Sequence, residues 1–341
     1  MRLHWIDALK GFGIILVIAI HSSIYCIFPT ISTLLTAGYM AMFFILSGYT
    51  AKKESITSGI AKKAKRLLIP YIFYGTIITS FFAIFDLAIG HFNTREWIGL
   101  LYSRYSLYPL GTTPNVVLLS LRSTSPLWFL TAMFLSFVWF YLYANIKKAA
   151  GKVLCVILYI IATMILYYSP ILLPWSFDTS FLCALFIITG YEFKEYAIKE
   201  YKKNLLYFLT LLVMLAVYIA LVTFNNNANL SIRIYGELGT LSIILYYIFS
   251  LFITVIYSET LKLCDKNMIG RFFSFVGKHS LRIMCIHMPL ITVLGWGLNR
   301  FGVFGIIMVF VTAFACSLGI SVGIERVCNR YLDKCSLLKY L

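Results

Sequence analysis

One histidine and two charged residues in the first apolar segment have the types and the spacing needed for acid–base chemistry. His21 lies well inside the apolar run 11–29, where an ionisable side chain is costly and therefore marks a functional site by default. Lys10 precedes it by about three helical turns, roughly 16 Å of rise, so both fall on nearly the same helix face. Asp7 lies within one turn of Lys10 on that face. The pattern predicts a cation at the membrane edge and an imidazole near the middle of the membrane.

This arrangement suits transfer of a proton from a hydroxyl group. A neutral imidazole can accept such a proton, and burial among apolar helices favours the neutral form. We therefore predict that His21 is a general base and that Lys10 and Asp7 set its position and charge. Simpler roles stay open. His21 could be hydrogen-bonded to a neighbouring helix, Lys10 could be an edge cation that reaches water, and Asp7 could cap the helix.

A basic cluster, Lys63, Lys65 and Arg66, ends the loop 52–66 just before the third apolar segment. Lysine and arginine in this place can bind the phosphates of a nucleotide-bearing donor that arrives from the cytoplasm. The alternative is the ordinary excess of basic residues in cytoplasmic loops. The sequence has no glycine-rich phosphate-binding loop of a known type.

The segments predicted to lie outside contain aromatic and polar residues that suit a ligand such as a sugar. The candidates for substrate binding are Trp128, Asp178, Tyr235 and Glu237. Anchoring at the membrane interface is the alternative for the aromatic residues, and a helix N-cap is the alternative for Asp178.

Two further motifs favour structural roles. The small pair Ser47–Gly48 permits close helix approach, so we expect helix packing there. A second buried histidine, His287, precedes Pro289, and a proline within a helix frees a carbonyl that a polar neighbour must satisfy.

Composition identifies the class of protein that positions these residues. The chain has 341 residues, of which 61% are hydrophobic and 12% charged, and its mean hydropathy is +0.87. A water-soluble globule does not need so much apolar surface, so we predict an all-α polytopic membrane protein. The net charge of +16 does not indicate nucleic-acid binding, because the basic residues lie in short loops between apolar segments. The eight cysteines contain no CxxC pair, which indicates free thiols and no metal site.

The hydrophobic pattern predicts a single membrane domain, 1–341, with about ten helical spans. The predicted spans are 11–29, 34–50, 67–90, 125–145, 153–170, 179–195, 204–223, 239–259, 279–298 and 304–325. An even number of spans places both termini on the same side of the membrane. We find no separate soluble domain and no clear internal repeat.

The distribution of basic residues decides which side that is. With both termini in the cytoplasm, all but five of the 29 lysines and arginines fall in cytoplasmic segments, as the positive-inside rule requires. The exceptions are Arg95, Arg104, Arg122, Arg233 and Arg300. The prediction is therefore an N-in, C-in topology.

Six short motifs, in order and across nearly the whole chain, resemble the membrane acyltransferase-3 family, specifically its sugar O-acetyltransferase branch. The most specific is a basic residue, ten intervening residues and a histidine, here Lys10 and His21. The motifs are Ile6-Asp7-Ala8-Leu9-Lys10-Gly11 leading to His21-Ser22, Met42-Phe43-Phe44-Ile45-Leu46-Ser47-Gly48-Tyr49, Lys65-Arg66-Leu67-Leu68-Ile69-Pro70-Tyr71, Leu127-Trp128-Phe129-Leu130, Gly277-Lys278-His279-Ser280-Leu281 and Ile286-His287-Met288-Pro289-Leu290.

The resemblance implies a multi-pass protein of a bacterial-type plasma (inner) membrane. It implies that acetyl-CoA from the cytoplasm, used as donor and not as a permanently bound cofactor, acetylates a hydroxyl of a cell-surface polysaccharide. It also implies that His21 is the essential histidine, that Lys10 is its basic partner, and that Lys63, Lys65 and Arg66 meet coenzyme A. The family often has paired arginines in the last of these places, and lysine lacks their bidentate geometry.

A transporter or flippase for a small polar or glycan substrate is the alternative function. Its expected features are inverted repeats and broken helices around a site in the middle of the membrane, and no clear repeat is present. A purely structural membrane partner would not need His21 at all.

Overall fold

The computed structural model describes residues 3–90, 95–104, 107, 125–194, 204–265 and 267–331. Within these residues the regular structure is helical, apart from one isolated bridge between Asn229 and Ile234. The helices are α1 (His4–His21), α2 (Pro29–Thr36), α3 (Tyr39–Tyr49), α4 (Ile56–Ala88), α5 (Arg95–Tyr102), α6 (Trp128–Asn145), α7 (Ala149–Tyr167), α8 (Phe177–Glu192), α10 (Leu205–Phe224), α11 (Leu241–Cys264), α12 (Met268–Lys278), α13 (Ser280–Leu298) and α14 (Gly302–Tyr331).

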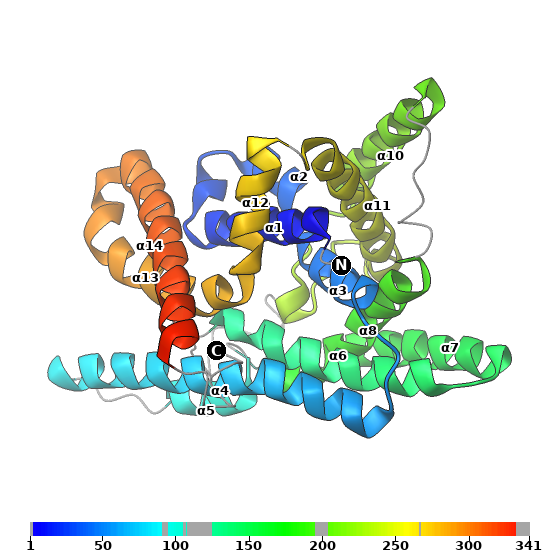
Figure 1. Cartoon of the computed structure of the whole chain (residues 1–341), viewed down its shortest axis with the longest axis horizontal. Helices are drawn as coiled ribbons and strands as arrows, with labels where there is room; N and C mark the ends of the chain where they lie inside the picture. The colour runs from blue at the N-terminus through cyan, green and yellow to red at the C-terminus, as the bar shows by residue number, and fades with distance from the viewer. Residues whose placement is uncertain are drawn as a thin grey trace.

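The arrangement is that of a multi-pass membrane protein, and the predicted fold class is confirmed. Eight helical segments in the described part of the chain are long and apolar enough to cross a membrane. One of these segments, Ser280–Cys328, includes both α13 and α14, and α8 adds an apolar helix of 16 residues. A helix therefore corresponds to each predicted span. Figure 1 shows α1 near the centre, with α13 and α14 on one side, α10 and α11 on the other, and α4, α6 and α7 along one edge.

The first span ends earlier than the sequence predicts, so the expected continuation of the helix to residue 29 is wrong. α1 ends at His21. The Ser22 amide still makes the helical hydrogen bond to the Ile18 carbonyl at 2.9 Å, and the Ser22 hydroxyl donates to the same oxygen at 2.7 Å. Ser23 then adopts a left-handed conformation with φ 65°, which a continuing helix cannot accommodate. Pro29 starts α2, where its missing N–H costs nothing. His21 thus lies at the end of a helix and not within one.

The third span begins earlier than predicted, because α4 starts at Ile56 and not near residue 67. The Ser55 hydroxyl accepts a hydrogen bond from the Ser58 amide and caps the helix. The basic cluster is therefore carried on a helix, where residues three and four positions apart share a face. The position of each basic residue on this helix determines whether its side chain faces the cavity.

Two close helix crossings hold the centre of the bundle together. A Cβ atom on Gly48 of α3 would clash with the backbone of Ile187 in α8, and a Cβ on Gly190 would clash with the backbone of Ile45. Gly11 of α1 meets the backbone of α12 in the same way. Helices without a hydrophobic driving force between them associate through such small residues. The predicted packing role of Ser47–Gly48 is confirmed for the glycine.

Candidate active site

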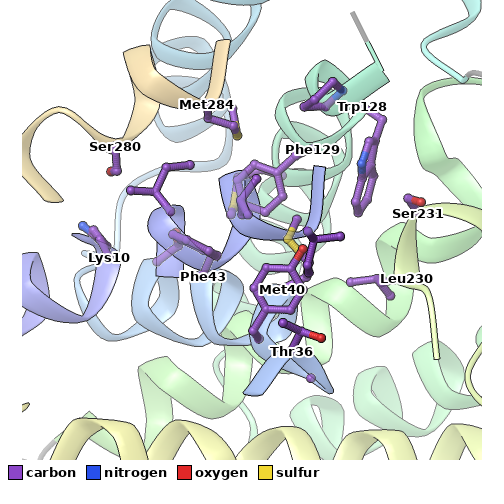
Figure 2. A pocket seen from close by; sticks show the side chains of 18 of the residues that line it. Lys10, Thr36, Met40, Phe43, Trp128, Phe129, Leu230, Ser231, Ser280 and Met284 are labelled. Carbon is purple, nitrogen blue, oxygen red and sulfur yellow. The ribbon is translucent and has the colours of Figure 1, made fainter. Parts of the chain in front are cut away.

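A cavity of about 470 Å³ lies inside the helical bundle. Its walls come from α1, α2, α3, α4, α6 and α13, together with the loop 228–231 and one residue of α11. Figure 2 shows Lys10 and Ser280 at one end of this pocket and Trp128 and Ser231 at the other. The volume is in the range of small-molecule sites, roughly 300–1,000 Å³.

Helix α1 contributes one continuous face to the cavity. Lys10, Ile14, Val17 and His21 line it, at spacings of four, three and four residues. These intervals follow the 3.6-residue period of an α-helix. The structure thus brings Lys10 and His21 to one cavity, as their spacing predicts.

Asp7 lies elsewhere on the same helix. It is buried, with 5% of its surface exposed, beside the crossing of α1 and α12, where its backbone carbonyl faces Gly277. Asp7 is not among the described residues that line the cavity. This position favours a role for Asp7 in the packing of α1 against α12 over direct contact with a ligand.

Helix α4 places part of the basic cluster in the cavity wall. Lys63, Arg66 and Leu67, which share a face, line the cavity. The Lys63 ammonium lies 3.4 Å from the centre of the Phe137 ring, which also lines the cavity and favours a cation at this distance. Lys65 points to the exposed side of α4 and is absent from the described lining. Lys63 lies close enough to Lys10 and to Arg66 for their charges to interact, so the three basic side chains share one end of the cavity.

The cavity lining also contains neutral polar groups, of which Trp128 and Ser231 lie at the end away from Lys10 (Figure 2). The others include hydroxyl and amide side chains from Tyr25, Ser32, Thr33, Thr36 and Asn229. Ser32 and Thr36 follow the outward-running α1, and Asn229 follows the outward-running α10, if the N-terminus is inside as the charge bias predicts. In that topology the cationic end faces the cytoplasm and the neutral polar end faces the exterior.

Asp178 is the centre of a buried ionic cluster and not a cavity residue. One carboxylate oxygen accepts from the Arg104 guanidinium, and the other accepts from Arg233 at 3.1 Å. The three side chains are at most 2% exposed. The alternative of an N-cap is also wrong, since the N-cap of α8 is Ser176. Two positive charges around one carboxylate join three outer segments of the chain.

Neither Tyr235 nor Glu237 reaches the cavity among the described residues. Tyr235 is 1% exposed and packs against the rings of Tyr167 and Tyr246, with centroids 6.0 and 5.7 Å away. Burial, reinforced by the Asp178 carboxylate, raises the pKa of the Tyr235 phenol well above its ordinary value, so this group stays neutral. Glu237 is exposed, and its carboxylate accepts from the Asn227 amide.

Sequence reasoning missed the roles of Arg104 and Arg233. Both belong to the few basic residues on the outer side, where the topology rule disfavours them. That exception was the available signal, because a basic residue in a disfavoured place needs its own structural reason. Arg104 donates to Ser231, which lines the cavity, and to Leu173 at 3.2 Å. The ionic cluster thereby holds the cavity wall at Ser231, at the end of the cavity predicted to face the exterior.

His287 of α13 is the second imidazole at the site. Its ring centre lies 5.3 Å from that of His21, and it is fully buried. Nδ1 lies 3.0 Å from the carbonyl oxygen of Ile283, whereas Nε2 has no hydrogen-bond partner among the described residues. The described cysteines are free, and no group of three His, Cys, Asp or Glu side chains in the described part of the chain could hold a metal ion.

Comparison with known proteins adds the identity of the fold. The family model of an acyltransferase domain matches residues 3–326. No curated protein and no solved structure matches the chain. The matched segment includes α1 with Lys10 and His21, and it continues through most of α14. Because the match covers nearly the whole chain, this multi-pass membrane protein belongs to the acyltransferase-3 family.

Proposed function

We propose that this membrane acyltransferase is an O-acetyltransferase. It moves an acetyl group from cytoplasmic acetyl-CoA to a hydroxyl group of a sugar in a cell-surface polysaccharide, across a bacterial-type plasma membrane. The observation that carries the proposal is a cavity that contains three basic residues at one end, neutral polar groups such as Trp128 and Ser231 at the other, and His21 in its wall.

The basic end suits the donor. Coenzyme A carries phosphates, and ammonium and guanidinium groups form short, strong hydrogen bonds with phosphate oxygens. Lys10, Lys63 and Arg66 supply these groups from two helices. Lys65 is exposed on α4, so it contacts the part of the donor that lies outside the cavity.

The chemical step needs one proton acceptor and no metal. The unprotonated nitrogen of His21 takes the proton of the sugar hydroxyl, and the oxygen attacks the carbonyl carbon of the thioester. The C–S bond breaks as the new C–O ester forms, and the imidazolium returns its proton to the coenzyme A sulfur. Lys10 lies on the same helix face about three turns from His21, so it contacts the donor and not the reacting hydroxyl.

The outer end suits the acceptor. Sugars offer several hydroxyl groups and an apolar ring face, which match hydroxyl side chains and an indole. Trp128 and Ser231 provide both kinds of contact at this end. The predicted substrate-binding role is then indirect for Asp178, Tyr235 and Glu237. They affect the acceptor only by stabilising the loops that they contact.

Acetyl transfer in membranes tests the proposal. Vesicles that contain the protein are given radiolabelled acetyl-CoA and polysaccharide, and label in the polysaccharide is counted. His21→Ala should lower the rate by about 10²- to 10⁴-fold, the usual contribution of a general base. His4→Ala, at the exposed start of the same helix, is the matched control and should leave the rate unchanged. Full activity of His21→Ala at normal protein level rejects the proposal.

A transporter is the second candidate function, because one feature of the cavity favours it. The span Pro29–Tyr49 is interrupted between α2 and α3, where Gly38 has φ 75° and lines the cavity. Discontinuous helices beside a central site are typical of transporters. Flux of a glycan into proteoliposomes without acetyl-CoA would support this function, and acetyl-CoA-dependent ester formation without flux would exclude it.

A further inference from the structure

We propose that His287 is a positioning residue for His21. It accepts the N–H of the His21 ring, so that the other His21 nitrogen faces the cavity with its lone pair. The catalytic effect of this arrangement depends on the proposed function. The arrangement of the two rings does not, because it follows from the positions of α1 and α13.

The protonation of His287 follows from its surroundings. A backbone carbonyl can only accept a hydrogen bond, so the contact of 3.0 Å between Nδ1 and the Ile283 oxygen requires a proton on Nδ1. In the neutral ring the lone pair is then on Nε2. This atom is buried and lacks a partner in the described part of the chain, which is costly for a polar atom in an apolar bundle.

His21 is in the right place to supply that partner. The ring centres are 5.3 Å apart and the planes are inclined by 43°. No hydrogen bond joins the two rings as they stand, and at this separation a rotation of the His21 side chain brings one of its ring N–H groups to Nε2. The fully buried ring of His287 is fixed by its own backbone contact, whereas His21 is half-buried and lines the cavity.

The pair gives His21 one defined tautomer. A histidine whose first nitrogen donates a hydrogen bond presents the lone pair of its second nitrogen, which is the form a general base needs. During the reaction the cavity-side nitrogen takes the hydroxyl proton and later returns it to the coenzyme A sulfur. The N–H that points to His287 is retained throughout, so the pair gains one proton when the hydroxyl reacts, loses it to the sulfur, and ends the turnover unchanged.

Three substitutions on α13 separate positioning from packing. His287→Leu removes the acceptor, and we expect kcat for acetyl transfer to fall about 100-fold with KM for acetyl-CoA unchanged. His287→Gln keeps an acceptor oxygen near the place of Nε2 and should stay within about tenfold of the unchanged protein. Cys285→Ala is the control, because Cys285 is equally buried on the same helix and should have no effect. A normal kcat in His287→Leu, or equal loss in the leucine and glutamine variants, overturns the proposal.

A spectroscopic test does not depend on acetyl transfer. Histidine labelled with ¹⁵N in the ring is incorporated, and His21 is assigned by the signals lost in His21→Ala. We expect one protonated and one unprotonated ring nitrogen for His21, and a mixture of tautomers in His287→Leu. The same His21 spectrum in both proteins overturns the positioning role. If the protein transfers no acetyl group at all, the proposed function fails while this measurement still decides the role of His287.

Discussion

Two clusters of basic residues in this molecule have opposite surroundings, because one lines a cavity and the other is buried around a carboxylate. At the predicted cytoplasmic end, Lys63 and Arg66 face a cavity from α4. At the predicted outer end, Arg104 and Arg233 are fully buried against the Asp178 carboxylate. Charges that line a cavity can meet an incoming anion, whereas charges enclosed with a carboxylate in an apolar bundle are committed to the fold. The difference teaches that the surroundings of a basic residue, and not its charge, indicate whether it serves ligand binding or architecture.

Removing the centre of the outer cluster should have the largest effect. Asp178→Leu leaves two buried guanidinium groups without their carboxylate, and we expect the free energy of unfolding to fall by about 3–5 kcal/mol. Thermal unfolding in detergent, followed by size-exclusion chromatography, measures this loss. Glu237→Gln is the control, since Glu237 is exposed and should unfold like the unchanged protein. Equal stability of the two variants would mean that the cluster does not hold the outer loops.

Removing charge at the inner end should change binding and not folding. Lys63→Ala and Arg66→Ala should each raise KM for acetyl-CoA by about 10- to 100-fold, the effect of one lost hydrogen bond to a charged group, with a normal unfolding temperature. Steady-state kinetics over a range of acetyl-CoA concentrations measures this. Lys65→Ala, one residue away on the exposed side, should raise KM less than either. If Lys65→Ala has the largest effect of the three, the cavity is not the donor site.

A smaller effect is expected at the end of the cavity that contains Trp128. Trp128→Phe keeps an aromatic ring but reduces the apolar surface and removes the indole N–H, so KM for the polysaccharide should rise about threefold to tenfold. Kinetics at saturating acetyl-CoA measures this change. Trp296→Phe is the control, because Trp296 stacks on Phe85 away from the described cavity lining. The same KM in both variants would remove Trp128 from the acceptor site.

The fold and the first half of the site could be predicted because they depend on local periodicity. Apolar segments of membrane-spanning length indicate helices, and the fixed helical period places Lys10 and His21 on one face of α1. The end of α1 at His21 and the start of α4 at Ile56 could not be predicted in the same way. They depend on the left-handed backbone of Ser23 and on the hydrogen bond by which Ser55 caps α4.

The other half of the site depends on contacts between residues that are far apart in the chain. Nothing near Asp178 in the sequence indicates that Arg104 and Arg233 will enclose it, and nothing near His21 indicates His287. The substrate-binding role predicted for Asp178, Tyr235 and Glu237 rests on their predicted outer location alone. Only the packing of the loops shows that they lie outside the cavity.

The sidedness of acetyl transfer tests the central claim most directly. Proteoliposomes are loaded with polysaccharide and given acetyl-CoA only outside, in the preparation whose cytoplasmic face points outward, and ester formation in the lumen is measured. Transfer from the basic end of the cavity to the end near Trp128, past His21, predicts lumenal ester in the unchanged protein and its loss in His21→Ala. Ester formation only when donor and acceptor share one side, or equal lumenal ester in both proteins, would contradict the account.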